Sequence, residues 1–185
     1  MNATLLSYED HLRSIRQDAE GLMAGLSDAQ FNWPPAPGRW SMAGCFDHLN
    51  KSAADLFIPM IDKAIAGARA RGLKSDGPFA YSAFERWCIR NNDAPAKRKF
   101  KAAKKFHPAP QLKIDQVRSA FLRWQDELDR RLREADGFDL QRAKAVWGFW
   151  PVKLSLGGSF QMMLAHERRH IFQAREVRQH HEFPR

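Results

Sequence analysis

The 185-residue chain is poor in cysteine and has no long hydrophobic run. Its two cysteines, Cys45 and Cys88, form no C-x-x-C pair, so neither a disulfide framework nor a thiolate zinc site is indicated. No stretch approaches the roughly 20 apolar residues of a membrane-spanning helix, and residues 1–16 are rich in polar and charged side chains. We therefore expect no membrane span and no signal peptide, and a reducing cytoplasm fits the cysteine content.

The motifs of several large enzyme classes are also missing. The sequence contains no G-x-S-x-G nucleophile elbow, no G-x-x-x-x-G-K phosphate loop and no G-x-G-x-x-G dinucleotide fingerprint. It shows no alternating strand pattern either. Catalytic residues, if present, must therefore form a different motif, and we expect them to lie on helices.

Hydrophobic residues, in contrast, are plentiful, at 44% of the chain. This share excludes an intrinsically disordered protein. The formal net charge is +9. Much of the excess lies between Arg86 and Lys105, where Asp93 is the only acidic residue.

Four segments have apolar residues at the three- and four-residue spacing of an amphipathic helix, at about 5–25, 41–70, 114–135 and 159–179. Ser41 is the predicted N-cap of the second helix, and Pro59 is expected to bend it. The segment 31–38 contains three prolines and is expected to be non-helical.

These elements predict an all-α protein, a four-helix bundle without strands. Residues 71–111, between the second and third helices, are basic and interrupted by prolines. We expect them to form a long, wrapped and partly helical crossover. No linker divides the chain, so residues 1–185 are predicted to be one domain with this crossover as an insertion.

A histidine pair marks the last predicted helix. His166 and His170 lie one turn apart, so their side chains project within about 40° of each other. They border the apolar stripe, whereas the polar face carries Arg168, Arg169, Arg175 and Glu176. Imidazoles turned toward a core need partners, which are either hydrogen bonds or one shared divalent cation.

His48 is the candidate third ligand, because it lies in the second turn of the second helix beside Cys45 and Ser52 on a largely inward surface. Three imidazoles with an open position form a catalytic arrangement for zinc, and they also suit nickel, copper and iron. We expect a divalent metal, zinc or nickel. Cys45 is interpreted as a small buried residue outside the site.

The segment 166–170 also spells H-E-x-x-H, the zinc metalloprotease motif. A metzincin needs Gly and His where this chain has Gln173 and Glu176, which argues against a protease. Glu167 remains the candidate catalytic residue, as a base toward a metal-bound water or thiol. The alternative is a solvated or salt-bridged side chain.

Four motifs together resemble the DinB-like family: Gly38-Arg39-Trp40-Ser41, then His48-Leu49, then Trp150-Pro151, then the segment 166–173. The similarity extends from the first predicted helix to about Val177. It implies a bundle with an up-down-down-up path, a divalent metal on His48, His166 and His170, and a homodimer.

The resemblance also implies an enzyme with a small-molecule substrate. Members with a known activity include small-thiol-dependent transferases and isomerases, and others are described as metal-dependent hydrolases. We expect an S-transferase that uses a low-molecular-weight thiol, or a hydrolase, in which the metal activates thiol or water. Arg39 and Lys153 are candidates to hold an anionic substrate. Aromatic residues of two loops either wall the pocket or plug the loops: Trp33, Trp147, Phe149 and Trp150.

The crossover supports an alternative interpretation, a non-catalytic binding module. Basic residues interleave with phenylalanine in the segments 97–101 and 104–106, as in some nucleic-acid-binding surfaces. A solvated, charged loop explains the same residues. A nucleic acid or another acidic partner is therefore the second interpretation and not the favoured one.

Overall fold

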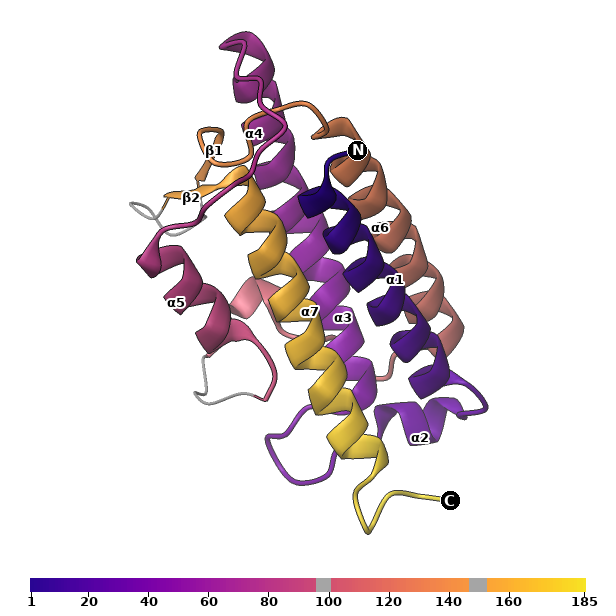
Figure 1. The fold of residues 1–185 in the computed structure, drawn as a ribbon. Helices are drawn as coiled ribbons and strands as arrows, with labels where there is room; N and C mark the ends of the chain where they lie inside the picture. Colours follow the sequence, from indigo (N-terminus) through magenta and orange to yellow (C-terminus); the bar gives the residue numbers. More distant parts are fainter. Residues whose placement is uncertain (96–100, 147–152) are drawn as a thin grey trace.

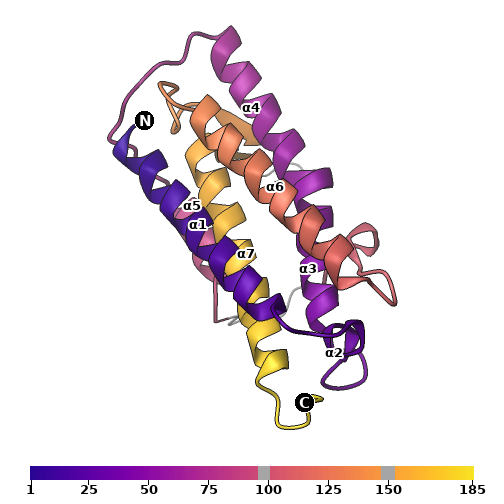
Figure 2. The same ribbon diagram turned by 90° about the vertical axis from the view of Figure 1, so that its right-hand side faces the viewer.

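The computed structural model describes residues 1–95, 101–146 and 153–185, and four helical rods lie side by side in it (Figure 1). α1 (Ala3–Met23) and α7 (Leu156–Arg178) run in one direction. The rod of α3 (Met42–Ser52) and α4 (Ile58–Ala70) runs in the opposite direction, and so does the helix α6 (Ile114–Glu134), as the side view in Figure 2 shows. The all-α bundle with an up-down-down-up path is thereby confirmed. Within the described ranges, no helix has the length and apolar character needed to cross a membrane.

α1 forms over the first predicted segment. The side chain of Asn2 caps it by accepting a hydrogen bond from the backbone N–H of Leu5, 3.1 Å away. At its other end, Arg178 of α7 donates to the carbonyl of Gly21, at 2.6 Å. The buried face repeats every three or four residues, at Leu5, Tyr8, Leu12, Ile15, Ala19, Leu22 and Met23.

A short helix, α2 (Asp28–Asn32), precedes the proline-rich loop. Ser27 and Gln30 form a capping box at its start, and Phe31 is fully buried. The expectation of a non-helical segment is therefore wrong for the first two of residues 31–38. Reciprocal capping and one buried aromatic ring offset the low intrinsic stability of so short a helix.

The second rod changes its helical form midway. α3 (Met42–Ser52) is capped by Ser41, as predicted, and continues through a π-helical turn (Ala53–Phe57) into α4 (Ile58–Ala70). Pro59 has no N–H to donate, and in a regular α-helix its ring would clash with the carbonyl four residues earlier. The wider π turn immediately before this proline relieves that conflict.

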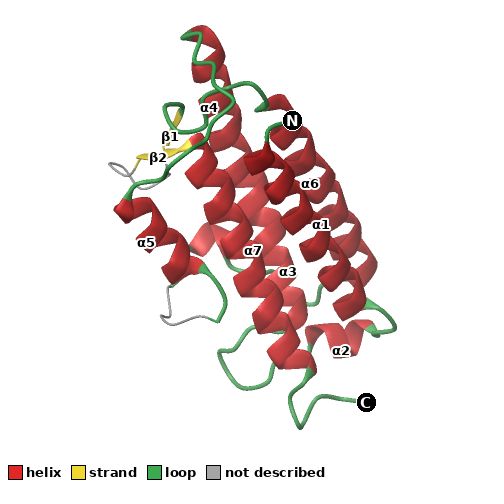
Figure 3. Cartoon of the chain, viewed as in Figure 1, coloured by secondary structure: helices red, strands yellow, loops and turns green. Residues whose placement is uncertain are grey.

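The crossover contains a fifth helix, α5 (Ala83–Asn92), and a 3-10 turn (Lys104–Phe106), so it is partly helical as expected (Figure 3). α5 packs against α7. Arg168 of α7 forms an ion pair with Asp93, the C-cap residue of α5, at 2.6 Å. The bundle therefore has one face covered by an additional helix.

Two short strands, β1 (Lys144–Val146) and β2 (Lys153–Ser155), pair antiparallel before α7 (Figure 3). The expectation of a protein without strands is wrong here, because three residues are too few to show alternation. β2 leads directly into α7, which begins before the predicted Ser159 and is capped by Ser155.

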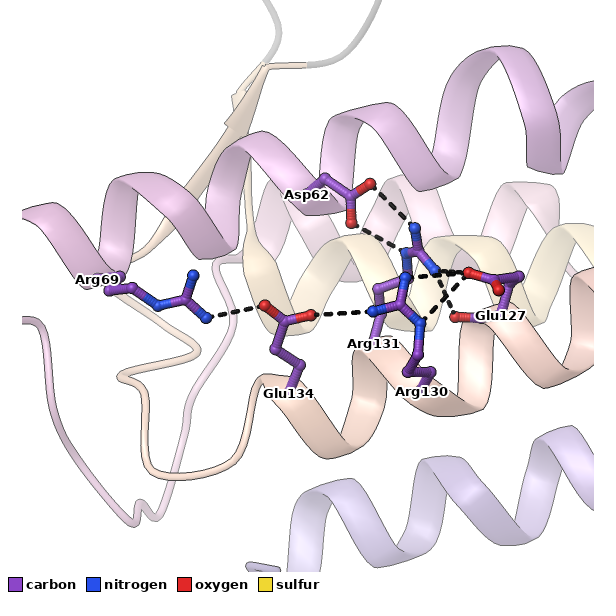
Figure 4. A network of polar contacts seen from close by, with 6 residues as sticks. All are labelled: Asp62, Arg69, Glu127, Arg130, Arg131 and Glu134. Atoms are coloured by element: carbon purple, nitrogen blue, oxygen red, sulfur yellow. Dashed lines mark hydrogen bonds and ion pairs between the residues drawn. The ribbon is translucent and has the colours of Figure 1, made fainter.

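Charged side chains join α4 to α6 (Figure 4). Arg131 of α6 is 7% exposed and pairs with Asp62 of α4, with 2.9 Å between Nε and Oδ1, and with Glu127 of its own helix. Arg69 pairs with Glu134 at 2.8 Å. These contacts fix the relative position of the two parallel rods around the apolar core.

Candidate metal centre

Three histidines from two rods meet inside the bundle: His48 of α3, and His166 and His170 of α7. The Nε2 atoms of His48 and His166 are 3.1 Å apart. The ring centroid of His170 lies 4.5 Å from that of His48 and 4.7 Å from that of His166. The structure thus brings the predicted one-turn pair and the predicted third ligand together.

A backbone carbonyl of the crossover fixes the tautomer of His48. Nδ1 of His48 lies 2.9 Å from the carbonyl oxygen of Phe106, which can only accept a hydrogen bond. The proton of this imidazole is therefore on Nδ1. The lone pair is on Nε2, which points toward His166, and this is the orientation that a ligand to a shared ion requires.

Two side chains of α3 hold this part of the crossover in place. Lys51 Nζ donates to the carbonyl of His107 at 2.8 Å, and Asp47 Oδ2 accepts from the backbone N–H of Ala109 at 2.9 Å. Lys51 and Asp47 also pair with each other at 2.8 Å. We call the segment 106–109 and its two anchors the crossover clamp.

All three imidazoles are neutral at pH 7. Burial lowers the pKa of His48, and it lowers that of His166 to about 3, with smaller contributions from His48 and Arg169. The pKa of His170 lies well below its ordinary value, first because of burial and then because of the neighbouring imidazoles. Neutral imidazole is the form that binds a metal, so no proton has to be displaced.

This donor set fits a divalent cation. Two nitrogens bound to one tetrahedral zinc ion lie about 3.3 Å apart, close to the 3.1 Å between the Nε2 atoms of His48 and His166. Nδ1 of His166 and Nδ1 of His170 are buried without a hydrogen-bond partner. An ion held by Nε2 of His166 would not contact Nδ1 of the same ring, so the fit rests on the Nε2 separation and on the three neutral nitrogen donors.

The loop before α3 walls the site. Gly38 has φ of 74°, in the left-handed region that glycine occupies without strain. Trp40 packs on two of the rings, with its centroid 4.9 Å from that of His48 and 5.8 Å from that of His170, nearly parallel to the latter at 25°. The segment 38–41 therefore supplies the turn, the wall and the N-cap of α3.

The histidines line a cavity of about 1040 Å³. Its outer residues, such as Arg39 and Lys101, are exposed, whereas His48 and Cys45 are buried. Phe57, from the π-helical turn, places its ring 5.4 Å from that of His166. The volume lies just above the usual range for small-molecule pockets, about 300–1,000 Å³.

The family follows from a comparison with known protein families. The family described as the DinB superfamily matches residues 11–174, a range that holds the three histidines and Trp40. The chain belongs to the DinB superfamily. No curated protein matches it. The resemblance noted in the sequence is thus confirmed, and the metal-centre geometry belongs to a DinB superfamily bundle.

Four aromatic residues were predicted either to wall this DinB superfamily cavity or to plug the loops, and none of them lines it in the part of the chain that the structure describes. Trp33 is not among the lining residues, because it packs against His180 and Phe183, at 5.5 and 5.7 Å between ring centroids. Trp147, Phe149 and Trp150 lie outside the described residues. The aromatic residues that do line the cavity are Trp40, Phe57, Phe106 and Phe172.

Of the two predicted cationic residues, Arg39 lines the cavity and Lys153, in β2, does not. The sequence analysis missed Arg169, which it placed on a polar helix face. Arg169 is only 6% exposed, lines the cavity and donates to the carbonyl of Asn91 at the end of α5. The packing of α5 on α7 buries this face. The sequence predicted a partly helical crossover but not the face of the bundle on which its helix packs.

Glu167 follows His166 in sequence, but its side chain contacts α6. Its Oε1 accepts a hydrogen bond from Nε2 of Gln125, 2.8 Å away, and Glu167 is not among the cavity-lining residues. It is 4% exposed, and burial raises its pKa to about 7. The alternative of a solvated side chain is therefore wrong, and the role of a general base stays a prediction.

Cys45 lines the cavity but does not belong to the three-histidine group. Burial raises the pKa of its thiol to about 12, so the thiol is protonated at pH 7. Only the thiolate is a good metal ligand. These properties agree with its interpretation as a small buried residue.

The nucleic-acid interpretation loses one of its aromatic residues. Phe106 is 6% exposed, and its ring packs edge-on to that of His48 at 6.2 Å, so it is not available to stack on a base. Lys104 and Lys105 are exposed. The segment 97–100 lies outside the described residues.

Proposed function

We propose that this DinB superfamily protein is a metal-dependent enzyme that acts on a small molecule. Its ligands to a divalent metal, zinc or nickel, are His48, His166 and His170. The observation that carries the proposal is the meeting of three neutral imidazoles in a cavity that can hold a small substrate. The reaction is the transfer of a low-molecular-weight thiol or a hydrolysis.

A divalent metal, when bound, lowers the pKa of a thiol or a water molecule and so supplies a nucleophile near pH 7. The protein contributes the rest. The carbonyl of Phe106 holds the His48 proton on Nδ1, which keeps Nε2 free as a ligand. Trp40 covers two of the rings and limits the access of water to them.

Metal content tests the first half of the proposal. Protein purified without chelator should contain about one zinc or nickel ion per chain by elemental analysis. His170→Ala should lose most of it. The control is His11→Ala, which removes an exposed histidine of α1 and should keep the metal. A wild-type metal content near zero under these conditions overturns the proposal.

Activity tests the second half. The zinc- and nickel-loaded proteins are given 1-chloro-2,4-dinitrobenzene with glutathione or cysteine, and p-nitrophenyl acetate without thiol. Turnover only with a thiol supports an S-transferase, and turnover of the ester alone supports a hydrolase. Glu167→Gln should lower the rate strongly if Glu167 is the base, despite its contact with Gln125. No turnover by either loaded form contradicts an enzyme for these substrate classes.

The homodimer implied by the family resemblance is part of the proposal. Sedimentation equilibrium of the metal-loaded protein at micromolar concentration tests it directly. A mass of one chain at all concentrations contradicts it.

A further inference from the structure

Three cationic side chains converge on the cavity from separate parts of the chain. Arg39 precedes α3, Lys101 lies in the crossover, and Arg169 is in α7. Glu176 is the only carboxylate among the lining residues that the structure describes. The cavity is therefore positively charged even before any metal is considered.

The outer two of these cations are available to a ligand. The side chains of Arg39 and Lys101 are exposed, and neither makes a hydrogen bond or ion pair to any other described residue. A planar guanidinium and an ammonium group are the two side chains that most often bind carboxylates and phosphates. No carboxylate of the described residues therefore neutralises the charge of these two side chains.

Arg169 carries the positive charge deeper into the cavity. Arg169 is 6% exposed, lines the cavity together with His166 and His170, and donates a hydrogen bond to the backbone carbonyl of Asn91. Its positive charge attracts an anionic group that enters this part of the cavity.

The three proposed metal ligands add no negative charge. Neutral imidazoles leave a divalent ion with its full charge of +2, whereas a carboxylate ligand would reduce it. This step rests on the proposed function. Together with Arg39, Lys101 and Arg169, a divalent ion on neutral ligands would make the cavity strongly selective for anions.

The walls, in contrast, are apolar. Trp40, Leu56, Phe57, Phe106 and Phe172 surround the histidines, in a cavity of about 1040 Å³. Such a space is far larger than a small inorganic anion needs, and its lining favours a hydrocarbon or aromatic body. Charge and shape therefore point to the same type of ligand.

We propose that the cavity binds small organic carboxylates with an apolar body, that Arg39 and Lys101 contact the carboxylate, and that the aromatic walls contact the body. Arg169 provides the inner positive field. The substrate of the proposed enzyme, or the thiol that it uses, belongs to this class.

Phenylacetate and its neutral isostere phenylacetamide test this proposal by isothermal titration calorimetry. We expect phenylacetate to bind wild-type protein about tenfold more tightly than the amide, since charge-assisted hydrogen bonds are roughly twice as strong as neutral ones and a small difference in free energy changes affinity severalfold. The double variant Arg39→Gln/Lys101→Gln should reduce the preference to about twofold or less. Equal affinity of the two compounds for wild type, or no binding of either at millimolar concentration, overturns the proposal.

A matched control separates these two cations from net charge. Arg13→Gln/Lys63→Gln removes the same charge from exposed positions of α1 and α4 that do not line the cavity. This variant should keep the wild-type preference. A preference that survives in Arg39→Gln/Lys101→Gln, or that is lost equally in the control, contradicts the assignment of these two residues.

The titrations are run on zinc-loaded and on chelator-treated protein, with the zinc content measured in parallel. Discrimination by protein that takes up no zinc when zinc is supplied supports the carboxylate site and rejects the proposed metal centre. One bound zinc ion per chain without discrimination between phenylacetate and phenylacetamide supports the metal centre and rejects the carboxylate site. The two proposals therefore fail separately.

Discussion

Nδ1–H of His48 in α3 donates a hydrogen bond to the backbone carbonyl of Phe106 in the crossover, at 2.9 Å. The crossover thereby decides which nitrogen of a candidate metal ligand is free. The rings of the same two residues also pack edge-on at 6.2 Å. The sequence analysis considered the basic crossover as a possible binding module. Through Phe106, the crossover instead contacts a ligand of the candidate metal centre.

Releasing the crossover clamp should weaken metal binding. In Asp47→Ala/Lys51→Met the segment 107–109 loses both side-chain anchors, so the carbonyl of Phe106 no longer holds His48 in one orientation. Loss of such outer contacts lowers metal affinity by about 10- to 100-fold. Competition with a chromophoric zinc chelator measures the change.

The control for the clamp is Lys63→Met, on the exposed face of α4. It should leave zinc affinity within about twofold of wild type and the far-UV circular dichroism unchanged. An affinity of the double variant that matches this control would show that the clamp does not position His48.

Removal of the metal should leave the bundle folded. The apolar core is built around side chains such as Phe31, Phe46, Phe121 and Phe160, none of which depends on the histidines. Chelation should therefore lower the melting temperature by the few degrees that loss of a bound ligand produces and leave the helical signal intact. Loss of most of the far-UV helical signal on chelation would make the metal structural.

Local periodicity was sufficient to predict the bundle, because each rod repeats its buried positions within its own sequence. In α1 the predicted inner face and the observed one agree from Leu5 to Leu22. The same reasoning placed His166 and His170 on one side of α7, and the third ligand, His48, at a matching inward position. These features depend on spacing, which the sequence carries directly.

Features that depend on packing between elements were not predictable in this way. The sequence analysis assigned Arg169 to a polar face, but α5 buries this side chain. Few residues of α5 are buried, so its sequence has no clear apolar face that would predict the contact with α7. Glu167 lies 100° around the helix from His166, and only the position of α6 shows that this direction leads to Gln125 and not into the cavity.

Close approach of the crossover makes Gly157 intolerant of a side chain. A Cβ atom at this position would lie 2.8 Å from the ring atoms Cε1 and Cζ of Tyr81, whose hydroxyl is itself hydrogen-bonded to Tyr8 at 2.8 Å. Gly157→Ala should therefore lower the free energy of unfolding by about 1–3 kcal/mol, as measured by urea denaturation.

Gly21→Ala is the matched control for this glycine. Gly21 is exposed in α1, and nothing lies within 4 Å of an added Cβ there. The substitution should stabilise the protein by about 0.5–1 kcal/mol, the helix-propensity difference. If Gly157→Ala also increased the free energy of unfolding, Tyr81 would have to move aside at little cost, which contradicts the prediction.

Two neighbouring arginines of α6 should differ in their contribution to stability. The side chain of Arg131 is 8% exposed and pairs with Asp62 and Glu127, whereas that of Arg130 is 58% exposed. Arg131→Ala should cost about 1–3 kcal/mol of unfolding free energy, because buried packing and charged hydrogen bonds are lost together. Arg130→Ala should stay within about 0.5 kcal/mol of wild type. Equal effects would contradict the burial of Arg131.

Glu85 should make the stability of the protein depend on pH in the acid range. Burial of its carboxyl raises the pKa, but hydrogen bonds from Ser155 and Ser82 lower it more, so the folded pKa lies below the ordinary value of 4.5. Because the folded pKa is depressed, the carboxylate contributes its full stabilisation above pH 4.5. This contribution is lost as the pH falls through the folded pKa.

Glu85→Gln isolates this contribution. At pH 7 the variant should be about 1–3 kcal/mol less stable, because its amide has one acceptor oxygen and cannot accept at both sites, where the two carboxylate oxygens receive hydrogen bonds from Ser82 and Ser155. Urea denaturation at pH 7 and again below pH 4 should show the difference from wild type shrinking at the lower pH. Glu20→Gln, at an exposed ion pair with Arg118, should show a difference within about 0.5 kcal/mol at pH 7. A difference for Glu85→Gln that stays constant across both pH values would mean that the pKa of this carboxyl is the same in the folded and unfolded protein, contrary to the prediction.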